Sequence, residues 1–147
     1  MKIRTSIAAA GAAAVLAGAG AVMLPAMASA HSTTHTLKFT AVMMTPQTFF
    51  TQTSAGQADK DVNSAGKVIG YDVINVKFNP QTNTATGGVA LSTNGGILYG
   101  TLKLSNGPAT TGTVTGGTGT FKGATGTISG KSLSKTRTAV TVTYTTP

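Results

Sequence analysis

Acidic side chains are scarce in this sequence, and one of them falls where it could donate or accept a proton. The 147 residues include three Asp (Asp59, Asp61 and Asp72) and no Glu. Asp72 lies in an alternating run, and the residues that share its face, at positions 70, 74, 76 and 78, are Gly or apolar. If that face is buried, loss of hydration raises the pKa of the carboxyl and makes Asp72 a candidate catalytic residue. If the face is solvated, Asp72 pairs with a surface Lys, and both alternatives stay open.

Three tyrosines and one asparagine are candidate ligand-binding residues. Tyr71, Asn75, Tyr99 and Tyr144 lie in segments of β-type composition and could present a phenol or an amide to a bound molecule. The alternative for each tyrosine is an aromatic ring that packs the core. The alternative for Asn75 is a solvated position on a strand.

No motif indicates a metal, a cofactor or a nucleophilic triad. His31 and His35 lie near the expected mature N-terminus without a third ligand nearby, so we expect no metal site. No Ser stands in a Gly-x-Ser-x-Gly elbow. The run Gly130-Lys131-Ser132 lacks the earlier Gly and the following helix of a phosphate-binding loop. We therefore expect no cofactor.

The elements that would hold these residues are short β-strands. After residue 30 the chain is rich in Thr and Val, which favour strands, and Asn94-Gly95 predicts a tight hairpin. The predicted strands span residues 36–44, 48–53, 68–78, 85–92, 97–104, 110–115, 124–130 and 133–145. The absence of crossover helices excludes a parallel α/β fold. A sandwich and a barrel both remain, and strands such as 97–102, apolar or small on both faces, favour a barrel with a covered outer face.

The most specific motif is the glycine-rich run from Val114 to Gly126, Val-Thr-Gly-Gly-Thr-Gly-Thr-Phe-Lys-Gly-Ala-Thr-Gly. A strand that enters at Val114 must bend through residues 116–119, where Gly tolerates positive φ at little cost. Phe121 would then anchor the bend, and Ala124 and Gly126 would let the next strand approach closely. This motif therefore serves folding rather than chemistry.

That run resembles the hallmark shared by allene oxide cyclases, dirigent proteins and the actinobacterial allene-oxide-cyclase-like proteins. Residues 61–70 and 89–100 are similar to the turn and the central hairpin of the same family, so the resemblance covers about residues 36–146. It implies an all-β fold: an eight-stranded antiparallel up-and-down barrel, usually a homotrimer, that holds an apolar small molecule without a cofactor.

The resemblance also bears on function. Plant allene oxide cyclases use a Glu and a Cys in the pocket, and this chain has neither, which argues against that activity. Dirigent proteins use pocket Asp residues and steer coupling of radicals made by a separate oxidase, and Asp72 is the acidic residue placed in a predicted strand. The leading hypothesis is a barrel that steers cyclisation or stereoselective coupling of an apolar substrate. The alternative is a non-catalytic secreted or cell-surface binding protein, so whether the chain is an enzyme stays open.

The first 30 residues predict export. Lys2 and Arg4 precede an uncharged apolar run over residues 7–24, Pro25 interrupts it, and Ala28-Ser29-Ala30 fits a signal peptidase site. Cleavage there leaves residues 31–147 as one secreted domain without a membrane segment, whereas a retained anchor is the alternative.

The chain that follows the predicted export segment is basic and contains no cysteine. Without Lys2 and Arg4 the chain has nine basic and three acidic residues, a formal charge of +6. The basic residues are scattered singly and match no nucleic-acid motif, so we expect no nucleic-acid partner. Since Cys is absent, stability must come from a packed core or from oligomerisation.

Overall fold

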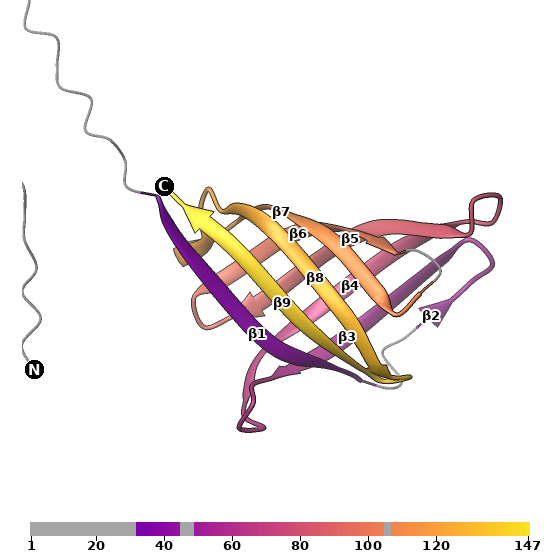
Figure 1. Cartoon of the computed structure of the whole chain (residues 1–147), viewed down its shortest axis with the longest axis horizontal. Coiled ribbons are helices and arrows are strands. Elements are labelled where there is room, and N and C mark those ends of the chain that lie inside the picture. The colour runs from indigo at the N-terminus through magenta and orange to yellow at the C-terminus, as the bar shows by residue number, and fades with distance from the viewer. Residues whose placement is uncertain (1–31, 45–48, 105–106) are drawn as a thin grey trace, which may run out of the picture.

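A computed structural model describes residues 32–44, 49–104 and 107–147, and these residues form one antiparallel sheet with a single short 3-10 helix, η1 (Figure 1). The elements are β1 (Thr33–Met43), β2 (Phe49–Phe50), β3 (Ser54–Val62), β4 (Val68–Asn79), β5 (Thr84–Thr93), β6 (Gly96–Leu104), β7 (Ala109–Gly117), η1 (Gly119–Phe121), β8 (Thr125–Ser134) and β9 (Arg137–Thr146). No helix among the described residues is long and apolar enough to cross a membrane.

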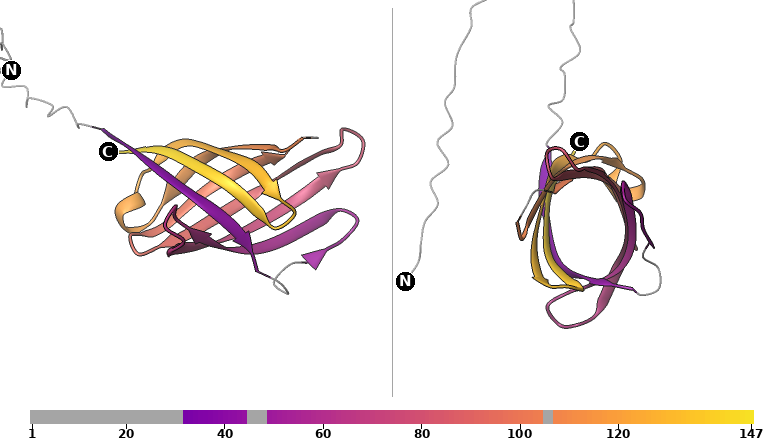
Figure 2. Two further views of the ribbon diagram at one scale, coloured as in Figure 1. Left: turned by 60° about the horizontal axis from the view of Figure 1, so that its bottom comes forward. Right: turned by 90° about the vertical axis from the view of Figure 1, so that its right-hand side faces the viewer.

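The sheet closes on itself as a barrel. Each long strand from β3 to β8 pairs antiparallel with the next one along the chain, β9 pairs with β1, and β1 also pairs with β3. The ring consists of eight long strands, β1 and β3 to β9, and the right-hand view of Figure 2 shows it along its axis. The two-residue β2 adds to the free edge of β3. The eight-stranded antiparallel up-and-down barrel predicted from the sequence is confirmed, because β1 pairs with both β9 and β3 and so closes the sheet.

Three strand assignments made from the sequence were wrong. The predicted strand over residues 48–53 contracts to β2, and β3 over residues 54–62 was not predicted at all. The last predicted boundary, between residues 130 and 133, lies inside β8, and the chain instead turns between Ser134 and Arg137. β3 was missed because its sequence, Ser-Ala-Gly-Gln-Ala-Asp-Lys-Asp-Val, has almost no β-branched residues. Pairing with β1 and β4 imposes the strand conformation.

The glycine-rich corner packs largely as the sequence predicts, and it closes one end of the barrel. Gly119 has a φ of 59° and begins η1, which places Phe121 in the core. Ala124 is fully buried beside it, and Gly126 lies against the β9 backbone at Thr143, where a side chain would collide. Gly117 has no positive φ, contrary to expectation. A Cβ there would come within 2.5 Å of the Phe121 Cβ, so Gly117 is needed for close packing.

The interior is divided along the barrel axis. At the end closed by η1, the ring of Tyr144 meets Phe121 edge-on at 5.5 Å and stacks on His35 at 5.1 Å, so this end is filled by aromatic side chains. At the opposite end the core cluster of Ala55, Val76 and Ala85 has smaller side chains. Large residues at one end and small ones at the other leave space inside the barrel.

The predicted export segment, including the cleavage point after Ala30 and the histidine at position 31, lies outside the described residues. The signal peptide and secretion therefore stay predictions.

Candidate functional site

All three acidic residues of the chain lie together inside the barrel. Asp59 and Asp61 project inward from β3, and Asp72 projects inward from β4, directly opposite Asp59 in the strand register. Their exposed fractions are 2% for Asp59, 0% for Asp61 and 4% for Asp72. A buried carboxyl is costly unless a charge or a donor compensates it. All three acidic side chains of the chain therefore lie where their ionised forms destabilise the fold most.

The cluster corrects part of the sequence analysis. Asp72 was expected to be the one acidic residue in a strand, and residues 61–70 were assigned to an Asp-rich turn. The turn instead begins at Asn63, whose Oδ1 accepts hydrogen bonds from the backbone N–H groups of Ala65 and Lys67, both at 3.0 Å. The signal for the missed residues was the spacing of two between Gln57, Asp59 and Asp61, which puts all three on one face of a strand.

Hydrogen bonding within the cluster is incomplete. The Nε2 of Gln57 donates to both carboxylate oxygens of Asp59 at 2.7 Å. With all three groups ionised, neither oxygen of Asp61 nor Oδ1 of Asp72 has a donor among the described residues. A proton on Asp72 supplies one, because protonated Asp72 donates a hydrogen bond to Asp61. The arrangement therefore favours a carboxylic acid paired with a carboxylate.

The electrostatics lead to the same conclusion. Burial raises the pKa of Asp72 to about 9, and the nearby carboxylates of Asp61 and Asp59 add to the rise. Burial also raises the pKa of Asp61 to about 7, partly offset by the hydrogen bond from Asp72. Burial raises the pKa of Asp59 as well, against the hydrogen bond from Gln57. At neutral pH Asp72 is thus a neutral acid in an apolar site, able to donate a proton.

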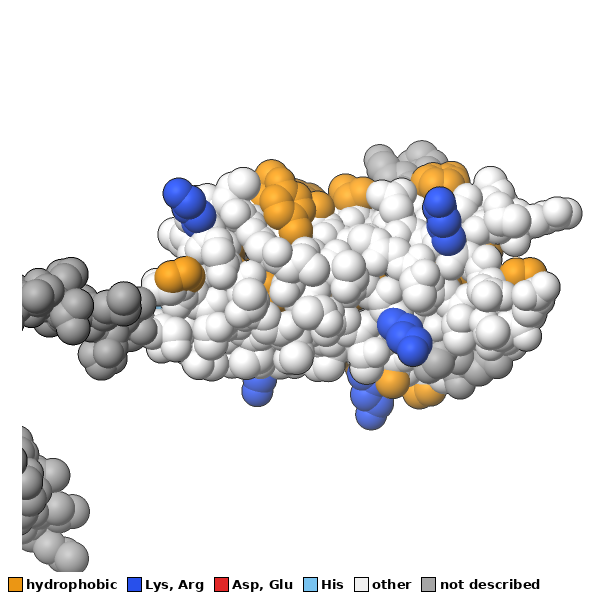
Figure 3. Space-filling model, turned by 90° about the horizontal axis from the view of Figure 1, so that it is seen from above, with side chains coloured by type: hydrophobic (Ala, Val, Ile, Leu, Met, Phe, Trp, Pro, Cys, Tyr) orange, Lys and Arg blue, Asp and Glu red, His pale blue; other side chains and the backbone are white. Residues whose placement is uncertain are grey.

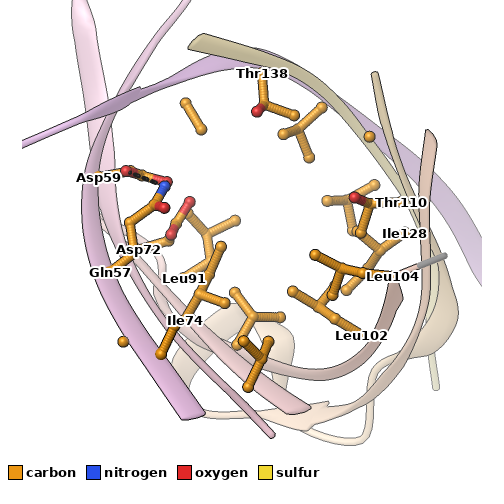
Figure 4. A pocket seen from close by; sticks show the side chains of 18 of the residues that line it. Gln57, Asp59, Asp72, Ile74, Leu91, Leu102, Leu104, Thr110, Ile128 and Thr138 are labelled. Atoms are coloured by element: carbon orange, nitrogen blue, oxygen red, sulfur yellow. Dashed lines mark hydrogen bonds between the residues drawn. The ribbon is translucent and has the colours of Figure 1, made fainter. Parts of the chain in front are cut away.

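Asp59 and Asp72 line a cavity of about 310 Å³ in the barrel interior. Figure 4 shows Gln57, Asp59 and Asp72 gathered on one wall of the cavity. Thr110 and Thr138 add two hydroxyl groups away from that wall. The remaining lining is Gly or apolar: Phe39, Ala41, Phe50, Ala55, Gly56, Ile74, Val76, Phe78, Val89, Leu91, Leu98, Leu102, Leu104, Ile128, Gly130, Val140 and Val142. An apolar cavity with a few polar groups on one side is typical of a small-molecule site.

The cavity reaches the surface at the end of the barrel opposite η1. Phe50 lines it and is itself 76% exposed, and its ring lies 5.5 Å from that of Phe78 at the end of β4. Asp61 is not part of the lining and lies behind the other two carboxyls. A ligand that enters past Phe50 would therefore contact Asp72 and Asp59, whereas Asp61 would not touch it.

The structure places the other predicted site residues away from this cavity. Tyr71, Asn75 and Tyr99 are exposed on the outer face of the barrel. Tyr71 and Asn75 are an odd number of positions from Asp72, so the alternation of a strand puts them on the opposite face. Tyr144 points inward but packs against Phe121 at the closed end and does not line the cavity. Of the predicted residues, only Asp72 contributes to the cavity.

The outer face of β4 to β6 carries apolar side chains. Val73, Ala90 and Tyr99 lie next to one another across the three strands, and Val73 and Tyr99 are exposed. Tyr71 extends this apolar row on β4. On the face shown in Figure 3, Lys and Arg side chains are scattered singly and no acidic side chain is visible.

Comparisons with known proteins agree with this architecture. No family model and no curated protein matches the chain. Among solved structures, a pyocyanin demethylase has a TM-score of 0.65 and 15% identity, covering 75% of this chain and 99% of its own. The pterocarpan synthase dirigent protein GePTS1 has a TM-score of 0.63 and 16% identity, covering 85% of this chain and 98% of its own. AbnU, an exo-specific intermolecular Diels-Alderase, has a TM-score of 0.62 and 11% identity, covering 78% of this chain and 97% of its own.

These similarities define the class of fold. At such low identity they show a shared barrel, and they transfer no residue role or substrate. The chain is an eight-stranded antiparallel barrel of the type found in dirigent proteins, as the glycine-rich motif predicted.

Proposed function

We propose that this protein is a secreted small-molecule-binding barrel that steers a proton-dependent cyclisation or coupling of an apolar substrate without a cofactor. The observation that carries the proposal is the 310 Å³ apolar cavity with Asp59 and Asp72 on one wall. A protein that only binds an apolar ligand would be more stable with an apolar wall at this place, because buried carboxyls lower the free energy of unfolding. Retaining two of them beside the ligand supports a chemical role.

Asp72 would act as the acid. In its protonated form it donates a hydrogen bond or a proton to a carbonyl, quinone or phenol oxygen of the bound molecule. In the empty site Asp61 accepts a hydrogen bond from protonated Asp72, and this hydrogen bond keeps the proton on Asp72. When the substrate cyclises or couples, the proton it loses returns to Asp72. The apolar walls fix the orientation of the substrate, and positioning alone can bias a reaction that also proceeds unaided.

The structural neighbours support this class of function. Their names describe a demethylase, a pterocarpan synthase dirigent protein and a Diels-Alderase, all of which act on small molecules. As in a dirigent system, a separate oxidase would generate a reactive substrate outside the barrel. The barrel would then capture it through the end lined by Phe50.

Binding is tested first, with a neutral fluorescent dye, N-phenylnaphthylamine. Thr110 lines the cavity, whereas Thr111, its neighbour on β7, is exposed on the outer face. We expect the dye to bind the parent protein and the control Thr111→Trp, and to lose at least about tenfold in affinity for Thr110→Trp, which fills the cavity. Equal binding to both variants would place the dye outside the cavity and contradict the proposal.

Steering is tested by coupling a simple phenol with a one-electron oxidase in the presence of the protein. We expect an excess of one enantiomer of the coupled product by chiral chromatography, and loss of that excess in Asp72→Asn. Racemic product from a parent protein that binds the phenol would contradict the steering role. It would support the alternative function, a non-catalytic secreted or cell-surface binding barrel.

Two further parts of the proposal concern export and assembly. We propose that residues 1–30 direct secretion and are removed, and that the apolar row of Val73, Ala90 and Tyr99 packs between copies in a homotrimer. The row supports assembly because solvated apolar area of this kind is unfavourable in a free monomer.

A further inference from the structure

The charges of this protein are sorted between its inside and its outside. All three acidic residues are buried in the barrel. The nine Lys and Arg residues that follow the first 30 positions are exposed: Lys38, Lys60, Lys67, Lys77, Lys103, Lys122, Lys131, Lys135 and Arg137. Within the described part of the chain, no basic side chain lines the cavity. The cavity is therefore a negative site inside a positively charged protein.

This sorting determines which ligand charges the cavity tolerates. A carboxylate or phosphate in the cavity would face the carboxylate of Asp59, with that of Asp61 nearby, and no cation would offset the repulsion, which is strong at low dielectric. A neutral ligand could accept a hydrogen bond from protonated Asp72, but it would leave the carboxylates of Asp59 and Asp61 without a counter-charge. A cation would supply the missing counter-charge, because opposite charges in contact favour the ionised carboxylates.

A metal ion does not fit this role. No group of three or more His, Cys, Asp or Glu side chains among the described residues is arranged to hold a metal ion. Most of the cavity wall is apolar, with Ile74, Leu91, Leu102 and Leu104 among its members. The counter-charge must therefore belong to an organic molecule with a large apolar surface.

We infer that the cavity binds an apolar molecule that carries one positive charge, a protonated amine or a cationic aromatic ring, with the charge against Asp59 and Asp72. The inference rests on the proposed function, because it names the substrate class of the same cavity. With a cationic substrate bound, Asp72 is ionised and accepts the proton that the substrate loses on cyclisation or coupling. Asp72 lines the cavity and its Oδ1 has no partner in the ionised cluster, so its carboxyl is the group placed to meet the cation.

Binding of such a cation should change the number of protons that the protein holds. The titratable groups that face one another here are Asp59, Asp61 and Asp72, and Gln57 adds only a neutral amide. Tyr144 and His35 lie at the closed end and do not line the cavity. A cation beside Asp72 lowers the pKa of that carboxyl, so binding at neutral pH should release a proton to the buffer.

Three probes with the same aromatic body and different charges test the inference: naphthylmethylamine, naphthylmethanol and naphthoic acid. Calorimetric titrations run in two buffers of different ionisation enthalpy measure both the affinity and the protons released. We expect the amine to bind at least about tenfold tighter than the alcohol, naphthoic acid to bind most weakly, and only the amine to release protons. Excess calcium chloride should not displace the amine.

Matched variants assign the selectivity to the carboxyls. Asp59→Asn combined with Asp72→Asn keeps the shape and removes both acids, and should make amine and alcohol bind about equally, with no proton release. Thr110→Val removes a polar group elsewhere on the lining and should preserve the preference for the amine. If the double variant folds poorly, Asp72→Asn alone should still reduce proton release.

The outcomes separate this inference from the proposed function. If the alcohol binds the parent protein as tightly as the amine, the cationic substrate class is wrong and the apolar binding site stands. If calcium displaces the amine, the site is a metal site and the inference is overturned. If no probe binds, both the inference and the proposed function are contradicted.

Discussion

Replacing Asp72 by Asn should make the protein more stable at neutral pH, because it removes an acid that the fold buries unfavourably. Asn has nearly the same shape, and its NH2 group can donate to Asp61 as protonated Asp72 does. The pKa of Asp72 is about 9 in the folded protein and 3.8 for an ordinary, solvated Asp. Between these values the folded state keeps the proton and the unfolded chain releases it.

The sign and size of the effect follow from this difference. Because the folded pKa is raised, the free energy of unfolding is highest below about pH 4 and falls as pH rises towards 9. From pH 3.8 to pH 7 the loss due to Asp72 is roughly 4 kcal/mol, at 1.36 kcal/mol per pH unit. We therefore expect Asp72→Asn to gain a few kcal/mol at pH 7 and little below pH 4.

Urea denaturation at a series of pH values and one protein concentration measures this difference. The parent protein should lose stability steadily from acid to alkaline pH, and Asp72→Asn should show a shallower loss that reflects Asp61 and Asp59. Asn75→Asp is the matched control, because it adds a carboxyl to the exposed face of the same strand and should scarcely alter the slope. If Asp72→Asn is no more stable than the parent at pH 7, the conclusion that Asp72 is a buried neutral acid is wrong.

Three other predictions concern the corner, the outer face and processing. Gly119→Val should lower the free energy of unfolding by about 2 kcal/mol or more, because φ is 59° there; unchanged thermal stability would show that the corner tolerates a side chain. The parent protein should scatter light as a trimer at micromolar concentration, and Val73→Lys should shift it towards a monomer; a monomeric parent would refute the assembly. Mass spectrometry of the exported protein should give a chain that begins at His31, whereas an intact chain in the membrane fraction would exclude cleavage.

A gain in stability that accompanies a loss of steering would identify Asp72 as a functional residue. Stabilising substitutions at working sites commonly cost activity, since such sites hold groups that the fold alone would exclude. A purely structural Asp72 would show the opposite pattern, with Asp72→Asn less stable and ligand binding otherwise unchanged.

The sequence by itself determined the fold class and much of its local structure. The alternation of strand residues, the Asn94-Gly95 hairpin and the bend around Gly119 depend on neighbouring residues and on backbone preferences. The apolar neighbours of Asp72 on its own strand favoured an inward carboxyl but left a solvated one open. All of this is local information, and the structure agrees with it.

Only the tertiary structure decided what surrounds Asp72. β3 has weak strand propensity, so its conformation and its inward face depend on pairing with β1 and β4. That pairing sets Asp59 opposite Asp72 and buries Asp61 behind them. Strand register between segments is not encoded in either segment alone. The cluster of three carboxyls, and with it the negative charge of the cavity, therefore arises from barrel closure.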